Sequence, residues 1–206
     1  MKNLIFDWSG VVRNTVTSQL WIVNKIFERY GISPIGLEEF RENWEQPHVL
    51  FYQKYLPKDY SEEERAKIYR EVAFGADCPK SSAYPEMAEL IRECKNNGAF
   101  LAIVSSDLPE TLITEVKAYG LENIFNEIII DADDKLEAVQ KIIKDNKLDL
   151  QETFFIGDSN HEIDVAKKTG IKSIAVTWGF TSEQKLEARN PDYIITDPKE
   201  LEKVIL

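Results

Sequence analysis

Short apolar runs alternate with amphipathic stretches over most of this chain, and this alternation limits the fold more than any other feature. Runs this short and uninterrupted are typical of strands buried on both faces, whereas the stretches between them have the three-to-four spacing of helices. The sequence therefore predicts an α/β fold, a three-layer Rossmann-like parallel sheet covered by helices on both faces. The apolar runs lie at residues 4–6, 100–104, 128–130, 153–156, 173–176 and 193–195.

Residues 15–81 interrupt this pattern. Apolar side chains recur at helical spacing over 16–30 and again over 37–44, and the block contains no strand pattern. We therefore expect a small all-helical domain inserted into the α/β core. The predicted domains are 1–14 together with 82–206 for the core, and 15–81 for the helical cap.

Composition and charge exclude several classes of protein. The net charge of −11 opposes binding to nucleic acid or to an anionic membrane. No apolar run approaches the length of about 20 residues that a membrane span needs, and the N-terminus lacks a signal-peptide pattern. Cys78 and Cys94 have no His or Cys partner at metal-binding spacing. We expect a cytoplasmic monomer or homodimer that binds neither nucleic acid nor membrane.

Polar side chains follow four of the predicted strands. The carboxyl ends of parallel strands open onto the crevice where ligands bind in open α/β sheets, so these side chains are expected to lie together. An acid after a strand is also a common turn former, but its repetition at successive strand ends favours a site. The side chains are Asp7, Ser105, Ser106, Asp131, Asp133, Asp134, Lys135, Asp158 and, one helical turn later, Glu162.

These residue types suit phosphoryl chemistry. Carboxylates form the oxygen-rich environment that Mg²⁺ prefers. A hydroxyl and a lysine ammonium can neutralise phosphoryl oxygens, and an aspartate can attack phosphorus and carry the phosphoryl group.

Four segments, in this order, resemble the motifs of the haloacid dehalogenase-like (HAD) superfamily, in the subgroup that includes phosphoglycolate phosphatase and β-phosphoglucomutase. The resemblance spans the whole chain, and the helical block falls where this subgroup has its cap. The segments are 6–11, 102–105, Lys135 and 155–162.

The resemblance implies a role for each phosphoryl-contacting residue. Asp7 is the expected nucleophile, and Lys135 is the expected catalytic lysine that neutralises the phosphoryl group. Ser105, with its neighbour Ser106, is expected to bind the substrate phosphate.

It also implies a Mg²⁺ site. The expected ligands are Asp7, the backbone carbonyl of Ser9, Asp158 and Glu162. Asp164 is an alternative to Glu162 as the second acidic partner.

Ser9 departs from the family pattern. In the family's phosphatases the residue two beyond the nucleophile is an Asp that serves as general acid and base. A serine keeps the backbone carbonyl for the metal, but its hydroxyl does not titrate near neutral pH. A positioned acid or base is worth about 10²–10⁴ in rate. We therefore expect a slow enzyme, one restricted to good leaving groups, or one that uses another group.

The predicted function is a Mg²⁺-dependent phosphatase of a small phosphorylated metabolite, acting through an aspartyl-phosphate. Two alternatives remain open. One is a catalytically silent member that binds a phosphorylated ligand or a protein, and the other is a phosphotransferase such as a sugar-phosphate mutase.

Overall fold

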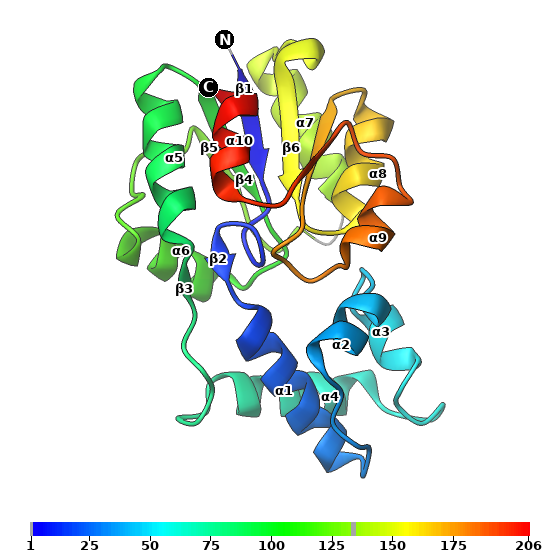
Figure 1. The fold of residues 1–206 in the computed structure, drawn as a ribbon. Helices are drawn as coiled ribbons and strands as arrows, with labels where there is room; N and C mark the ends of the chain where they lie inside the picture. The colour runs from blue at the N-terminus through cyan, green and yellow to red at the C-terminus, as the bar shows by residue number, and fades with distance from the viewer. Residues whose placement is uncertain (1, 133–134) are drawn as a thin grey trace.

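A parallel sheet forms the centre of the computed structural model, which describes residues 2–132 and 135–206 (Figure 1). Its strand order is β5-β4-β1-β6-β7-β8, and every neighbouring pair is parallel. The strands are β1 (Asn3–Phe6), β4 (Phe100–Val104), β5 (Glu127–Ile129), β6 (Thr153–Gly157), β7 (Lys172–Val176) and β8 (Tyr193–Ile195). The predicted parallel sheet is confirmed, and β1 lies at its middle, between β4 and β6. Of the acids predicted after β5, Asp133 and Asp134 lie outside the described residues.

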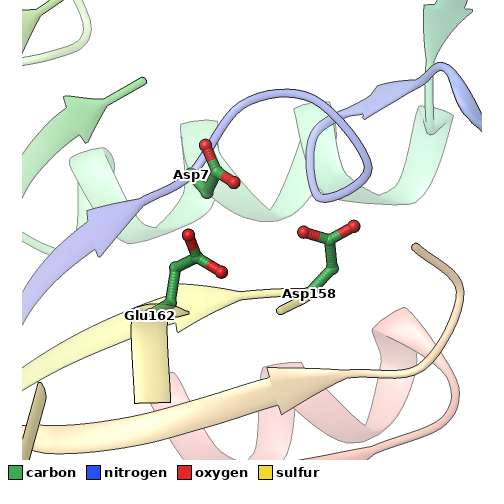
Figure 2. Close-up of side chains that lie close together, drawn as sticks. All are labelled: Asp7, Asp158 and Glu162. Atoms are coloured by element: carbon green, nitrogen blue, oxygen red, sulfur yellow. The ribbon is translucent and has the colours of Figure 1, made fainter. Parts of the chain in front are cut away.

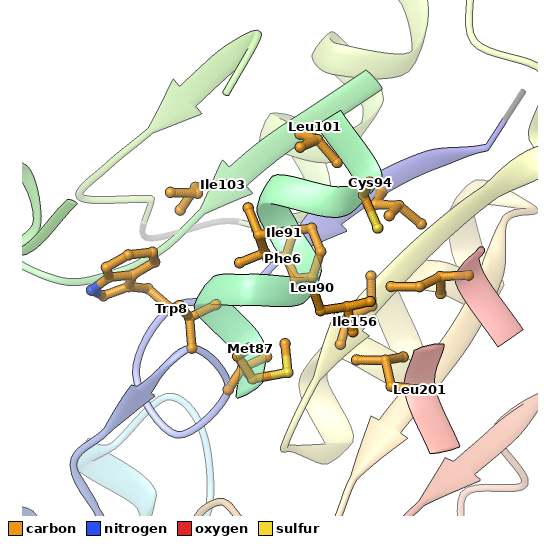
Figure 3. Close-up of a cluster of buried hydrophobic side chains, with 14 of the residues drawn as sticks. Phe6, Trp8, Met87, Leu90, Ile91, Cys94, Leu101, Ile103, Ile156 and Leu201 are labelled. Carbon is orange, nitrogen blue, oxygen red and sulfur yellow. The ribbon is translucent and has the colours of Figure 1, made fainter. Parts of the chain in front are cut away.

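Helices cover both faces of the sheet, because successive strand side chains point in opposite directions. Phe6 and Ile103 pack under α5, α6 and α10 on one face (Figure 3), and Ile5 and Val104 pack under α7 and α8 on the other. The core helices are α5 (Pro85–Asn96), α6 (Pro109–Ala118), α7 (Lys135–Asn146), η1 (Leu150–Glu152), α8 (Asn160–Thr169), α9 (Glu183–Glu187) and α10 (Pro198–Ile205). None of the helices in the described part of the chain is long and apolar enough to cross a membrane.

A separate group of helices lies between β1 and β4 and forms the predicted cap (Figure 1). These helices are α1 (Val16–Arg29), α2 (Leu37–Asn43), α3 (Val49–Gln53) and α4 (Glu62–Ala73). Their buried side chains form a cluster of their own, rich in aromatic residues. The short strands β2 (Arg13–Asn14) and β3 (Ser82–Ala83) pair antiparallel where the chain leaves and re-enters the core. The division into 15–81 and the remainder stays a prediction.

The cap is bonded directly to the core loop that follows β7. Arg41 donates to the carbonyl of Gly179 and to that of Trp178, both at 3.0 Å. The ring of Phe180 belongs to the aromatic cluster of the cap, with its centroid 5.1 Å from that of Trp44 and 6.1 Å from that of Phe40. The cap therefore shares its apolar core with a segment of the α/β domain.

Candidate active site

Asp7 lies at the carboxyl end of the central strand, where it is almost completely buried. Its backbone N–H continues the ladder with β6 by donating to Ile156 at 2.9 Å, and its Oδ1 accepts from the backbone N–H of Trp8 at 2.8 Å. The turn that follows requires glycine at position 10. Gly10 has φ of 82°, and a Cβ there would lie 2.1 Å from Oδ2 of Asp158. The chain thus turns sharply and brings two carboxylates together.

Three buried carboxylates converge at this edge of the sheet, those of Asp7, Asp158 and Glu162 (Figure 2). Each offers an oxygen that lies within 4.8 Å of the others. They come from the ends of β1 and β6 and from the first turn of α8. The structure therefore brings together acids that lie about 150 residues apart in the sequence, the arrangement expected for the carboxyl edge of a parallel sheet.

Lys135 lies among these carboxylates. Its Nζ is 3.0 Å from Oδ2 of Asp7 and 2.7 Å from Oε1 of Glu162. The lysine side chain is only 2% exposed. Lys135 is therefore not a solvated charge at the start of a helix, although it is the first residue of α7.

Burial and charge shift the pKa values of this cluster. Burial raises the pKa of Asp7 to about 7, although Lys135 opposes the shift. Burial, and then the neighbouring Asp7, raise the pKa of Asp158 well above its usual range. Burial also opposes ionisation of Glu162, but Lys135, His161 and the hydrogen bond from Ser159 together outweigh it, so the pKa of Glu162 is lowered. Burial works against the charge of Lys135 too, yet the attraction of Asp7 and Glu162 raises its pKa and keeps it protonated.

Asp158 has an oxygen available for a cation. Its Oδ2 accepts from the backbone N–H of Phe180 at 2.6 Å, whereas its Oδ1 is buried and has no hydrogen-bond partner within residues 2–132 and 135–206. An unpaired buried carboxylate oxygen is costly unless a ligand satisfies it. The donor set of Asp158 and Asp7 therefore fits a hard divalent cation such as Mg²⁺.

Both carboxylate oxygens of Glu162 have protein partners, in contrast to those of Asp158. Its Oε1 faces Lys135, and its Oε2 accepts from the backbone N–H of Ser159 at 3.0 Å and from its hydroxyl at 2.5 Å, completing a capping box at the start of α8. Asp164, the alternative acid, pairs with Arg189 at 3.4 Å on the outer side of the helix. Of the two acids, Glu162 is the one the structure brings to the site, and its role as a metal ligand stays a prediction.

The serines lie on the other side of Asp7. Ser105 is buried at the end of β4, and Ser106 is exposed. The hydroxyls of Ser9 and Ser105 both donate to the carboxylate of Asp107, at 2.8 Å and 2.9 Å to Oδ2. Asp107 was not predicted as a site residue, although it also follows a strand end, two residues after Ser105.

Arg13 connects Asp107 to a second acid, Glu115. Its Nε lies 2.7 Å from Oε1 of Glu115, and its Nη1 lies 3.9 Å from Oδ1 of Asp107. The other oxygen of Glu115 accepts from the indole N–H of Trp8 at 2.9 Å. Burial raises the pKa of Glu115. A network of ion pairs and hydrogen bonds therefore runs from the loop after β1 to α6.

With this geometry established, comparison with known proteins identifies the family. A family model described as haloacid dehalogenase-like hydrolase matches residues 4–176. The chain belongs to this family. The predicted HAD membership and the predicted hydrolase class are confirmed.

Relatives of this HAD hydrolase include named enzymes. A phosphoglycolate phosphatase from Synechococcus elongatus is 22% identical over 98% of this chain and 95% of its own length. A pyrophosphatase, PpaX, from Halalkalibacterium halodurans is 23% identical over 100% of this chain and 97% of its own length. A solved haloacid dehalogenase-like hydrolase from Streptococcus pneumoniae has the same fold, with a TM-score of 0.85 and 22% identity over 100% of this chain and 99% of that one.

Proposed function

We propose that this HAD hydrolase is a Mg²⁺-dependent phosphatase of a small phosphorylated metabolite, acting through an aspartyl-phosphate on Asp7. The observation that carries the proposal is the position of Asp7. Its carboxylate lies at the carboxyl edge of the sheet, 3.0 Å from a buried lysine and beside the unpaired oxygen of Asp158. A carboxylate, a fixed positive charge and a cation site are the parts that phosphoryl transfer needs in one place.

The protein residues divide the chemistry between them. A carboxylate oxygen of Asp7 bonds to phosphorus while the bond from phosphorus to the ester oxygen breaks, and the alcohol leaves with a proton. Water then attacks the same phosphorus, so that phosphate is released and the Asp7 carboxylate is restored. Lys135 neutralises negative charge beside Asp7 throughout, and the Ser105 hydroxyl, which donates to Asp107 in this structure, would turn to donate to a phosphoryl oxygen when substrate binds.

Asp7 and Asp158, with the backbone carbonyl of Ser9, would hold Mg²⁺. When bound, the ion neutralises charge that develops on the phosphoryl oxygens. Glu162 acts through Lys135, because it fixes the ammonium group against Asp7.

The relatives and the cap favour a small substrate. The named relatives act on phosphoglycolate and pyrophosphate, according to their names. The cap helices are joined to the core at the same edge of the sheet where Asp7 lies (Figure 1). We therefore place small phosphate monoesters and pyrophosphate first among the candidates.

The test is a panel of phosphorylated metabolites, including phosphoglycolate and pyrophosphate, assayed for phosphate release with and without Mg²⁺. We expect release that requires Mg²⁺ and is abolished in Asp7→Asn. Asp164→Asn is the matched control, since it removes an acid from the outer side of α8.

Unchanged turnover in Asp7→Asn would show that the nucleophile is wrongly assigned. Phosphate appearing on an acceptor and not in water would identify a phosphotransferase. Tight metabolite binding with no release over long incubation would identify a catalytically silent binder.

A further inference from the structure

The carboxylate of Asp107 accepts hydrogen bonds from two serines of the site and lies near an arginine. A short polar residue just before a helix commonly caps that helix, but the N-cap residue of α6 is Leu108, and no side chain caps this helix. The contacts of the Asp107 carboxylate are the Ser9 hydroxyl, the Ser105 hydroxyl and the Arg13 guanidinium. Its own backbone N–H donates to the Ser105 hydroxyl at 3.1 Å. Asp107 is thus fixed in orientation by Ser9, which lies two residues after Asp7, by Ser105 at the end of the neighbouring strand, and by Arg13.

The carboxylate lies directly beyond the shortened side chain of position 9. The Ser9 hydroxyl is 3.0 Å from Oδ1 and 2.8 Å from Oδ2 of Asp107. An aspartate at position 9 with the same side-chain rotamer would carry its carboxylate oxygens one bond beyond the place of the serine oxygen. The side chain of Asp107 is also 22% exposed, so water can reach it. The site therefore retains a carboxylate near position 9, although the loop after β4 supplies it.

We propose that Asp107 is the proton-transfer residue of this enzyme and takes over the task for which Ser9 has no titrating group. The proposal rests on the proposed phosphatase function. In the first step Asp107 gives the proton that it took from water in the preceding turnover to the ester oxygen, as the bond from phosphorus to that oxygen breaks, so a neutral alcohol leaves. In the second step the Asp107 carboxylate takes a proton from water as the water oxygen bonds to phosphorus. The bond from phosphorus to Asp7 then breaks, and Asp107 is again protonated.

Ser9 and Arg13 are positioning residues in this scheme. Ser9 donates one hydrogen bond that both carboxylate oxygens share, and Arg13 lies on the far side of Oδ1. Ser105 contacts the same Oδ2 that Ser9 does, which holds the carboxylate next to the hydroxyl expected to bind the phosphate. The proton-transfer group and the phosphate contact are therefore adjacent.

The test compares phosphate esters with poor and with good leaving groups. An alkoxide needs a proton to depart, whereas a phenolate with electron-withdrawing groups departs without one. We expect Asp107→Asn to lower kcat/KM for alkyl phosphates by about 10²–10⁴-fold. The same variant should keep kcat/KM for p-nitrophenyl phosphate close to the wild-type value. Asp107→Ser provides a second variant with the same expectation and a smaller side chain.

Glu115→Gln is the matched control. It removes an acid that also pairs with Arg13 but does not contact Ser9 or Ser105. We expect it to change alkyl and aryl phosphates equally. A selective loss that appears in Asp107→Asn and not in Glu115→Gln cannot come from altered charge around Arg13 alone.

The second step gives an independent signature. Without a base for the water, Asp107→Asn should release p-nitrophenolate in a burst of one equivalent per enzyme, followed by slow turnover. Restoring a carboxylate at the neighbouring position, in the double variant S9D/D107N, should recover most of the lost kcat/KM for alkyl phosphates. A residue with a merely structural role would give neither the burst nor the rescue.

Equal losses for the two classes of substrate, or wild-type values for both, would overturn the assignment of Asp107. Failure of the proposed function looks different. In that case the wild-type protein releases phosphate from no substrate, or Asp7→Asn retains full turnover, whatever residue stands at position 107.

Discussion

Replacing Lys135 with methionine should destabilise the folded protein in a way that depends on pH. Met keeps the length and volume of the side chain but removes its charge, which leaves Asp7 and Glu162 buried without their cation. At an effective dielectric constant of about 20, each contact contributes about 6 kcal/mol of gross Coulomb energy. The cost of removing the lysine from water offsets much of this Coulomb energy. Removing one partner of a buried ion pair therefore lowers the free energy of unfolding by a net of about 3–5 kcal/mol. For a chain of this size, that corresponds to a Tm lower by about 6–20 °C.

The sign of the pH dependence follows from the carboxyl groups. Removing the ammonium raises the folded-state pKa values of Asp7 and Glu162, because it lowers both in the wild-type protein. An acid whose pKa is raised by folding binds a proton on folding, so its penalty is absent below its unfolded pKa of about 4 and grows as the pH rises. The difference in Tm between Lys135→Met and the wild-type protein should therefore be small near pH 4. It should be largest above pH 7, the approximate pKa of Asp7.

The assay is thermal unfolding followed by circular dichroism from pH 4 to pH 8, with a chelator present so that divalent ions do not compensate for the missing charge. Lys141→Met is the matched control. Lys141 lies on the same helix, is 64% exposed and pairs with Asp145 at 2.9 Å. An exposed pair of this kind contributes little to stability, because solvent screens it. Equal Tm shifts for the two variants, or a shift that grows toward acid pH, would refute the reasoning.

Two further predictions concern the cation site. In the wild-type protein, Mg²⁺ at about 100 times its Kd should stabilise the fold by about 2.7 kcal/mol. Asp158→Asn should abolish this stabilisation, whereas Asp164→Asn should retain it. An equal Mg²⁺ response in both variants would contradict the proposed cation site. Gly179→Ala should weaken the stabilisation by Mg²⁺ and lower the stability of the fold by about 1–3 kcal/mol, because the added Cβ would lie 2.0 Å from Oδ2 of Asp158. Thermal unfolding with and without Mg²⁺ measures both effects. A wild-type response to Mg²⁺ would show that the Asp158 side chain moves aside freely.

The fold was accessible from sequence because each core strand is a continuous apolar run. β1, β4 and β6 carry buried residues at almost every position, as a central parallel strand requires. β2 and β3 have two residues each, too few to show any alternation, and they went unpredicted. The five-residue helix α9 was missed for the same reason.

The candidate site could be predicted from the sequence only in part. Asp7 and Asp158 follow strands whose neighbours in the sheet can be deduced, so their proximity follows from the topology. Whether Lys135 is solvated or buried depends on the path of the loop before α7, and only the structure places it between Asp7 and Glu162. Asp107 went unrecognised because its importance depends on the orientation of Ser9, a residue 98 positions away.

Phe180 has a consequence for anyone who exchanges caps between enzymes of this family. Its ring is part of the aromatic cluster of the cap, while its backbone N–H donates to the buried carboxylate of Asp158. A graft that carries only the helices between β2 and β3 would bring Arg41 without the carbonyls that accept its hydrogen bonds. It would also leave a cavity where the Phe180 ring packs. The segments that must be transferred together are thus not contiguous in the sequence. It consists of the cap helices together with the tripeptide at 178–180.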